Sequence, residues 1–308
     1  MTPSAGDGPA AQHASMSTDA SDLSMATSEP TSFWADVWRR FKRNRLAMVG
    51  LGLIVLIVLL AVFAEVITKY NPGTIDPIHK RESPSLKHWF GTDQLGRDMF
   101  SRVIFGARVS LRVGIFATAI ATVIGVVLGS LAGYYGGWID GLIMRITDIF
   151  LAFPYILAAL AIIAVIGTGE RTVILVLGLL GWLAIARVLR STILQIKETE
   201  YIDAARALGC SDFRIITRHI LPNAIQPVIV YATLFTGSAV LSEAALSFLG
   251  VGIQDPTPAW GLMVARGKNF LSVSPHLLFF PGAAIFLMVM AFVFVGDGLR
   301  DALDPRLK

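Results

Sequence analysis

The sequence offers few residues whose types and spacing suit a chemical reaction. It contains neither an HExxH zinc motif nor a nucleophile elbow. GLMVARGKN, residues 261–269, comes nearest to a phosphate-binding loop, but its glycines are six apart instead of five and no Ser or Thr follows the lysine. Cys210 is the only cysteine, which excludes an intrachain disulfide and a cysteine-based metal cluster. We therefore expect no catalytic residue, metal site or cofactor in this chain.

Glu243 is the acidic residue that lies farthest inside an apolar run. An ionisable group within a membrane span is a functional candidate, because its burial in lipid costs a few kcal/mol. Glu243 follows the start of its predicted span by about 30 Å of helix, which places it near the far interface, where that cost is smaller. The position favours a structural salt bridge or a helix cap. The alternative is an outer gate on a transport path.

A second candidate is the mostly polar segment DAARALGCSDFRIITRHILPN, residues 203–223, which lies between two strongly apolar runs. Residues 194–208 have helical spacing, and one face of that helix carries Tyr201, Ala204, Ala205 and Leu208. Gly209 is placed to end the helix with a left-handed cap. We therefore predict a helix and a sharp turn where a loose connector would suffice.

The second half of this segment predicts another short helix. Ser211 is placed to cap it, Phe213 and Ile220 supply apolar contacts, and Pro222 stops it or starts the next span. An exposed element of defined shape suits a groove of a partner protein. From the residues alone, a helix that rests on the membrane surface is an equal alternative.

The composition predicts that these candidates belong to an integral membrane protein. Of 308 residues, 54% are hydrophobic and 16% charged, and the mean hydropathy is +0.65, whereas soluble domains carry about 25% charged residues. The net charge of +4 is explained by basic residues that flank membrane spans. No basic stripe carries an aromatic stacking face, so nucleic-acid binding is not expected.

The hydropathy pattern predicts an all-α protein with six transmembrane helices. Residues 1–32 are predicted to be a disordered cytoplasmic tail, and residues 33–45 an amphipathic helix at the membrane interface. The predicted spans are 46–67, 113–134, 143–166, 172–190, 224–249 and 278–297.

Basic residues between 39 and 45 predict a cytoplasmic N-terminus, and six crossings return the C-terminal segment 298–308 to the cytoplasm. Residues 68–112 then form an extracytoplasmic loop. One observation opposes this topology, because that loop is itself rich in basic residues: Lys80, Arg81, Lys87, Arg97 and Arg102.

Three local patterns give further predictions. The glycine row Gly125, Gly129 and Gly133 predicts close packing of its helix against another. Pro154 predicts a kink in the span 143–166. Arg145 and Asp148, three residues apart, are predicted to pair with each other.

The segment 194–222 resembles the EAA loop of ABC importer permeases, whose pattern is E-A-A, three residues, G, nine residues, I-x-L-P. Six residues fall on that spacing: Asp203, Ala204, Ala205, Gly209, Leu221 and Pro222. Two positions depart from the pattern, because Asp203 stands for Glu and His219 for Ile. The resemblance implies that this loop couples the chain to an ATPase subunit through Asp203, Ala204, Ala205, Arg206, Gly209, Phe213, Arg214, Ile220, Leu221 and Pro222.

Four further stretches resemble the C-type permease of dipeptide, oligopeptide and nickel importers. They are FGTDQLGRDMFSRVIFGARVSL (90–111), MRITDIFLAFP (144–154), SEAALSFLGVGIQDPTPAWG (242–261) and GDGLRDALDPRLK (296–308). The resemblance covers residues 33–308 and implies a type I ABC importer permease fold in a prokaryotic inner membrane. The core domain is then 113–297, with five spans and the EAA loop.

The resemblance also implies the partners. They are a related B-type permease subunit, two ABC ATPase subunits that bind ATP and Mg, and an extracytoplasmic binding protein, which Glu243 or Trp260 is expected to contact. The expected solute is a dipeptide or oligopeptide, and the alternatives are a nickel chelate, glutathione or haem. An ion-gradient secondary transporter and a membrane anchor without a pore are the rivals from other classes.

Overall fold

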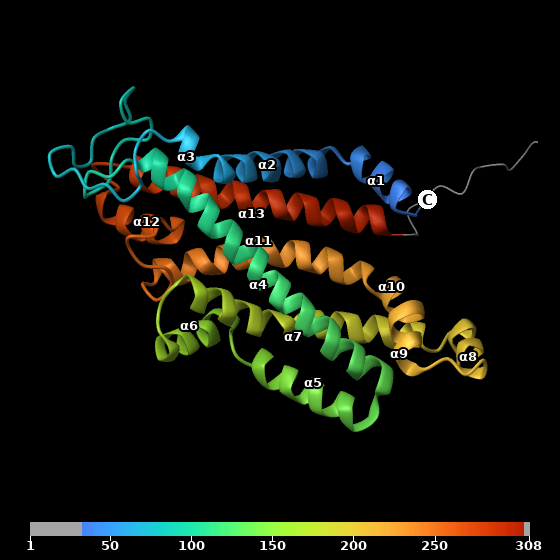
Figure 1. The fold of residues 1–308 in the computed structure, drawn as a ribbon. Coiled ribbons are helices and arrows are strands. Elements are labelled where there is room, and N and C mark those ends of the chain that lie inside the picture. The colour runs from blue at the N-terminus through green and yellow to red at the C-terminus, as the bar shows by residue number, and fades with distance from the viewer. Residues whose placement is uncertain (1–32, 305–308) are drawn as a thin grey trace, which may run out of the picture. The chain divides into compact units, whose positions relative to one another are not determined.

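The computed structural model describes residues 33–304, whose regular elements are helices (Figure 1). The predicted tail 1–32 and the last four residues lie outside the described part. The chain divides after Asp36, and residues from Val37 onward form one compact unit. Helix α1, Phe33–Arg43, lies within the interval predicted for the interfacial helix.

Within the described residues, five helices are long and apolar enough to cross a membrane, and a bent helix pair raises the number to as many as six. This confirms the all-α membrane architecture. The five are α2 (Arg45–Val62), α4 (Met99–Tyr135), α7 (Glu170–Ile196), α11 (Gln226–Phe248) and α13 (His276–Leu303).

The predicted span 143–166 is broken into two helices and is not one kinked helix. Helix α5, Gly137–Leu151, and helix α6, Tyr155–Ile166, meet at an angle of 89°. Pro154 lies at the break, where it lacks an N–H group and disfavours helical backbone at the residue before it.

Helix α5 is held to α7 by two ion pairs. Asp148 pairs with Arg187 at 2.6 Å, and Asp140 pairs with Arg190 through two hydrogen bonds. The predicted pair of Arg145 with Asp148 is therefore wrong, because a partner on the neighbouring helix takes the aspartate.

Helix α4 begins at Met99, well before the predicted start at residue 113, so the loop that begins at residue 68 ends at residue 98. The Asp98 side chain accepts a hydrogen bond from the Ser101 N–H at 2.8 Å and caps the helix. Arginines in its first turns hid this start, because they interrupt the apolar pattern. Distant acids neutralise two of them: Arg108 lies 3.1 Å from Glu65, and Arg112 lies 2.9 Å from Glu170.

Helices α4 and α7 form the most extensive helix pair, and the predicted glycine row lies between them. A Cβ atom at Gly125 would lie 2.6 Å from Ile185 Cγ2. At Gly129 it would lie 2.7 Å from the Ala186 carbonyl oxygen, and at Gly133 2.9 Å from Ile193 Cβ. The prediction of close packing is confirmed, and the partner is α7.

Gly129→Val is expected to lower the thermal unfolding midpoint of the purified protein in detergent. The new side chain would press on the backbone of α7, and overpacking of this kind costs about 1–3 kcal/mol. Gly52→Val is the matched control, because a Cβ at Gly52 of α2 has no neighbour within 4 Å. Equal midpoints for the two variants would contradict the tight contact.

The unit has two ends with different structures (Figure 1). The loop end carries α3 (Ala64–Ile67), the loop 68–98 and the segment 249–275, which includes α12 (Trp260–Gly267). The elbow end carries the segment 194–222, called the elbow below. It contains α8 (Glu200–Ala207), α9 (Asp212–Arg214), the π-helical turn η2 (Ile215–Ile220) and the start of α10 (Leu221–Ala224).

An ion-pair network joins the two loops of the loop end. Arg97 lies 2.6 Å from Asp93 and 3.0 Å from Asp255, and Arg102 and Arg266 also pair with Asp255. Burial raises the pKa of the Asp255 carboxyl, but the charge and hydrogen bond of Arg97, with Arg266 and Arg102, hold that pKa below its ordinary value. Two of the five basic residues that oppose the predicted topology, Arg97 and Arg102, thus serve to join the loops.

Candidate functional site

The elbow begins with a break that the sequence pattern did not predict. Helix α7 ends at Ile196 and α8 starts at Glu200, so the predicted continuous helix 194–208 is interrupted. The Thr199 hydroxyl donates to the Ile196 carbonyl oxygen at 2.6 Å. Such a local bond competes with the helical pattern and accompanies the change of direction between the two helices.

Gly209 forms the left-handed cap that the sequence predicts, with a φ of 74°. Its N–H donates to the Arg206 carbonyl at 2.9 Å, and the Cys210 N–H donates to the Ala205 carbonyl at 3.1 Å. These two bonds together are a Schellman motif, which satisfies carbonyls at the end of α8. The turn is therefore fixed by backbone hydrogen bonds and by the left-handed conformation.

The chain then enters α9 and a wide π-helical turn. Ser211 occupies the N-cap position, but its side chain makes no capping hydrogen bond, so the predicted side-chain cap is wrong. Pro222 lacks the N–H that would continue an α-helical ladder. It lies in the first turn of α10, where no N–H is needed. At the end of the wide turn, the Leu221 N–H reaches the Ile216 carbonyl, five residues back. π-Helical turns are rare in proteins, and those that occur are often found at functional sites.

The base of the elbow belongs to the protein's main hydrophobic core. Ile202, Ala205, Ile215 and Ile220 are buried in the same cluster as Ile193 of α7. The predicted face of Tyr201, Ala204, Ala205 and Leu208 is thus divided, because only Ala205 points inward. Ile220 is unavailable as a surface anchor, and Leu221 is half-buried against the same core.

The opposite side of the elbow exposes large apolar side chains. Leu208 is 84% exposed and Phe213 76%, and Tyr201 is 45% exposed. The other predicted coupling residues on the surface are Asp203, Ala204, Arg206, Gly209, Arg214 and Pro222. Apolar side chains presented by a rigid, charged segment are typical of a protein contact site.

Tyr134, at the end of α4, contacts both α8 and α9 of the elbow. Its hydroxyl donates to Asp212 Oδ1 at 2.7 Å, and the Arg206 guanidinium lies 5.9 Å from the centre of its ring. Arg206 also pairs with Asp203 at 3.0 Å. Sequence reasoning missed Tyr134, because nothing near it in the chain indicates a partner so far along the sequence.

Glu243 is fully buried in α11, close to the loop end. The Ser247 hydroxyl donates to its Oε1 at 2.8 Å, and the Ser110 hydroxyl of α4 donates to its Oε2 at 3.4 Å. No cation lies within 4 Å of the Glu243 carboxyl among residues 33–304, so hydroxyl hydrogen bonds take the place of the predicted salt bridge. The Ser110 bond joins α11 to α4, whereas the Ser247 bond lies within α11.

Trp260 is 2% exposed and begins α12. Its indole N–H donates to the Val103 carbonyl at 2.9 Å, and the ring packs against Gly106. In this structure Trp260 is an interior residue that joins α12 to α4, and its side chain is not available on the surface for a partner.

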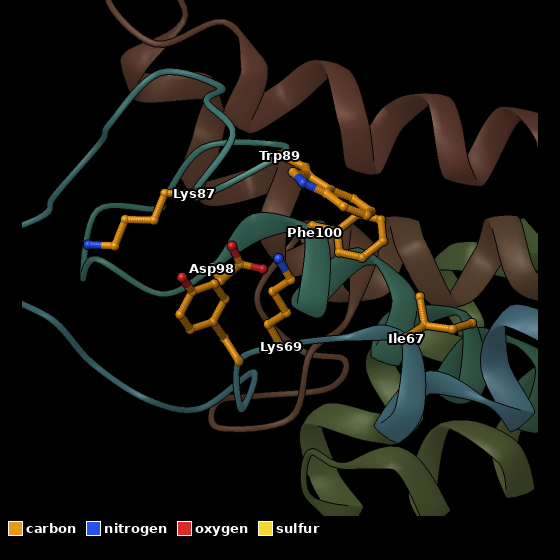
Figure 2. Close-up of a pocket in the computed structure, with 7 residues that line it drawn as sticks. Ile67, Lys69, Lys87, Trp89, Asp98 and Phe100 are labelled. Carbon is orange, nitrogen blue, oxygen red and sulfur yellow. The ribbon is translucent and has the colours of Figure 1, made fainter.

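A small pocket at the loop end lies beside the start of α4 (Figure 2). Lys69 and Asp98 lie beneath the rings of Trp89 and Phe100. Asp98 is already occupied, since His88 Nδ1 lies 2.8 Å from its carboxyl and Ser101 donates to it. The cavity measures about 20 Å³, which is room for a water molecule and not for a solute.

Comparison with protein families decides what kind of protein carries this elbow. Residues 125–308, more than half of the chain, match the model described as a binding-protein-dependent transport system inner membrane component. The chain belongs to this family. A second model, the N-terminal transmembrane domain of oligopeptide transport permease C, matches residues 32–84. The protein is therefore an ABC importer permease of the C type, and the elbow lies inside the family region.

Curated relatives match most of this permease. The dipeptide transport system permease protein DppC of Alkalihalophilus pseudofirmus is 46% identical over 275 residues, which cover 89% of this chain and 90% of the relative. The glutathione transport system permease protein GsiD of Shigella flexneri serotype 5b is 47% identical over 276 residues, covering 89% and 91%.

Solved structures show the same fold. A chain of the MetNI methionine ABC transporter, in an inward-facing conformation, superposes with a TM-score of 0.55. It is 21% identical, and the match covers 67% of this permease and 98% of that chain.

Glu243→Gln is expected to leave the stability of the permease nearly unchanged, whereas Glu243→Ala is expected to lose about 1–3 kcal/mol of unfolding free energy. Gln keeps one carbonyl oxygen as an acceptor for one serine hydroxyl and presents an amide N–H to the oxygen of the other, while Ala leaves both hydroxyls without an acceptor in a buried site. Thermal unfolding in detergent measures the difference. A midpoint for the Gln variant as low as that of the Ala variant would show that the negative charge itself is required.

Proposed function

We propose that this permease is one half of the translocation pore of an ATP-driven peptide importer, and that the elbow couples it to an ATPase subunit. The observation that carries the proposal is the elbow itself. Its base is part of the membrane core, and its other side presents Leu208 and Phe213 to solvent. A partner that binds these side chains would move the core with them.

The proposed orientation places the elbow and both termini in the cytoplasm and the loop end outside. Basic residues 39–45 before α2 support it, because positively charged segments remain inside. The ion pairs of Arg97 and Arg102 support it as well, because they give two of the positive charges at the loop end a structural role.

The nucleotide belongs to the proposed partners. Two ABC ATPase subunits would bind ATP and Mg, one of them at this elbow, since the sequence has no phosphate-binding loop of its own. A B-type permease subunit would complete the pore. A binding protein would deliver solute at the loop end, where Ile78 and Leu86 are 87% and 95% exposed.

The proposed mechanism is alternating access. Closure of the ATPase pair would shift the elbow, and the shared core would carry the shift into α7 and α11. The free energy available for this movement is limited by the difference in elbow binding between the two ATPase states.

The proposed solutes are dipeptides or oligopeptides, because the 46% identical relative DppC is a dipeptide transport system permease. Glutathione is the second candidate, because the GsiD relatives are as similar to the chain. Both candidates carry peptide bonds and free carboxylates, so they differ in side chains and length more than in class. A nickel chelate and haem remain alternatives that the sequence resemblance implies.

Uptake into proteoliposomes tests the proposal. The permease is reconstituted with its co-purified partners, and accumulation of a labelled dipeptide is compared with that of labelled glutathione. We expect uptake to require ATP, Mg and the binding protein. Uptake driven by an ion gradient without ATP would indicate a secondary transporter, and absence of any ATP-dependent uptake by the assembled complex would favour an anchor.

A further inference from the structure

The break between α5 and α6 exposes backbone at the depth of the membrane. Residues 151–154 are all exposed in the chain. A helix end leaves up to four carbonyl groups without partners inside the helix, and a helix start leaves N–H groups in the same state. Lipid cannot satisfy such groups, so a break of this kind is tolerated only where it is covered by protein or borders a water-filled cavity.

A cavity of about 330 Å³ lies beside this break. It is bounded by Leu151 and Tyr155 at the break, by α7 and by α11. Four hydroxyl-bearing side chains line it, and no acidic or basic side chain does: Tyr155, Tyr231, Ser238 and Ser242. The Tyr155 hydroxyl donates to the Leu177 carbonyl at 3.3 Å, which fastens the start of α6 to α7. Ser238 is exposed although it lies in the middle of α11, which is the least apolar of the five long helices.

A second cavity, of about 390 Å³, continues from the first toward the elbow end. The two share Tyr231 and Leu234. The second cavity extends to Gln226 and to Arg300 and Asp304 at the end of α13. A row of two cavities therefore follows α11 from mid-membrane to the elbow end.

The row closes toward the loop end. Beyond Ser242, α11 is buried at Glu243 and Ser247. Glu243 accepts a hydrogen bond from Ser110 of α4, and the Ser247 hydroxyl accepts one from the Ile253 N–H. The row of cavities therefore reaches the elbow end and stops short of the loop end.

A third cavity has a different lining. It also measures about 330 Å³ and lies between α2, α4 and α13, and every side chain that lines it is apolar or aromatic, such as Leu53, Ile57 and Leu287. The hydroxyl groups along α11 and the broken backbone beside them have no counterpart there.

We propose that the two cavities along α11 are this permease's wall of the solute path, in a state that is open toward the elbow end. The hydroxyl groups of Tyr231, Ser238 and Ser242 and the carbonyl groups freed at residues 151–153 bind the amide groups of a passing peptide. This rests on the proposed function and assigns the path within it. Tyr231 and Leu234 form the boundary between the two cavities. The absence of charged side chains from the central cavity fits a path that accepts peptides of differing charge.

Accessibility to water tests the path without depending on transport. In a Cys210→Ser background, Ser238→Cys and Leu53→Cys are each made in the full complex in inverted membrane vesicles, and a charged, membrane-impermeant thiol reagent is added at the elbow side. We expect Ser238→Cys to be labelled at least tenfold faster than Leu53→Cys, and ATP with vanadate, which holds the ATPases closed, to slow that labelling. Equal, slow labelling of both positions would overturn the assignment, whatever the uptake assay shows.

A second variant tests contact with solute. Ser238→Trp fills the central cavity from an exposed position, so the complex should assemble while ATP-dependent dipeptide uptake falls at least tenfold. Leu53→Trp is the matched control and should transport normally. Normal uptake by Ser238→Trp would exclude the path, whereas loss of ATP dependence in the unmodified complex would refute the proposed function and leave the labelling result standing.

Discussion

Replacing Leu208 and Phe213 together by glutamate is expected to abolish ATP-driven uptake by separating the permease from its ATPase. These side chains are the most exposed large apolar groups of the elbow. Burial of one such side chain in a partner contributes about 1.5–3 kcal/mol, so the loss of two weakens association by roughly two orders of magnitude or more. The measurement is the amount of ATPase that co-purifies with the tagged permease, together with uptake in vesicles.

The matched control is the pair Ile78→Glu and Leu86→Glu. Both side chains are at least as exposed as those of the elbow, but they lie in the loop 68–98. The control should retain the ATPase, which separates docking at the elbow from a general effect of added negative charge. Full retention of the ATPase by the Leu208 and Phe213 double variant would contradict docking through these side chains.

Gly209→Val is expected to reduce uptake at least tenfold while the isolated permease still folds. A left-handed conformation costs an ordinary residue about 1–2 kcal/mol, and a β-branched residue more. No atom lies within 4 Å of a Cβ placed at Gly209, so the backbone conformation is what the substitution disturbs. The turn between α8 and α9 would relax, and ATP hydrolysis would continue with little transport.

Gly209→Asn is the discriminating control, because asparagine adopts the left-handed conformation more readily than other residues with a side chain. It should retain most of the uptake. If Val and Asn were equally active, the shape of the turn would not matter for coupling; if both were equally inactive, the side chain itself would interfere with docking.

The helix ends and turns of the elbow could be predicted from the sequence, because they depend on residues that are neighbours in the chain. Gly209 has the left-handed backbone that its missing side chain permits, and Pro222 lies in the first turn of a helix, where its missing N–H is tolerated. The glycine row of α4 was predictable for the same reason, since only small residues permit that helix contact.

Features set by distant residues were not predictable. The inward side of α8 is decided by the core around Ile193, so the spacing of Ala204 and Ala205 could not tell which of them is buried. The arginines of α4 interrupt its apolar pattern, and the acids that pair with Arg108 and Arg112 lie far along the chain, at Glu65 and Glu170. Likewise Glu243 finds Ser110 on a helix that the sequence does not place beside it.

Helix α4 is unbroken and connects the loop end of the protein to the elbow end. Its 37 residues extend about 55 Å, well beyond the hydrocarbon core of about 30 Å. Arg102 near one end is fastened to Asp255, and Tyr134 at the other is fastened to Asp212. A displacement of the loop end can therefore be transmitted along this helix to the elbow, and a displacement of the elbow to the loop end. In the proposed complex, thermodynamic linkage then requires that a loaded binding protein at the loop end change the affinity of the elbow for its ATPase by the same factor by which ATPase engagement changes the affinity for the binding protein.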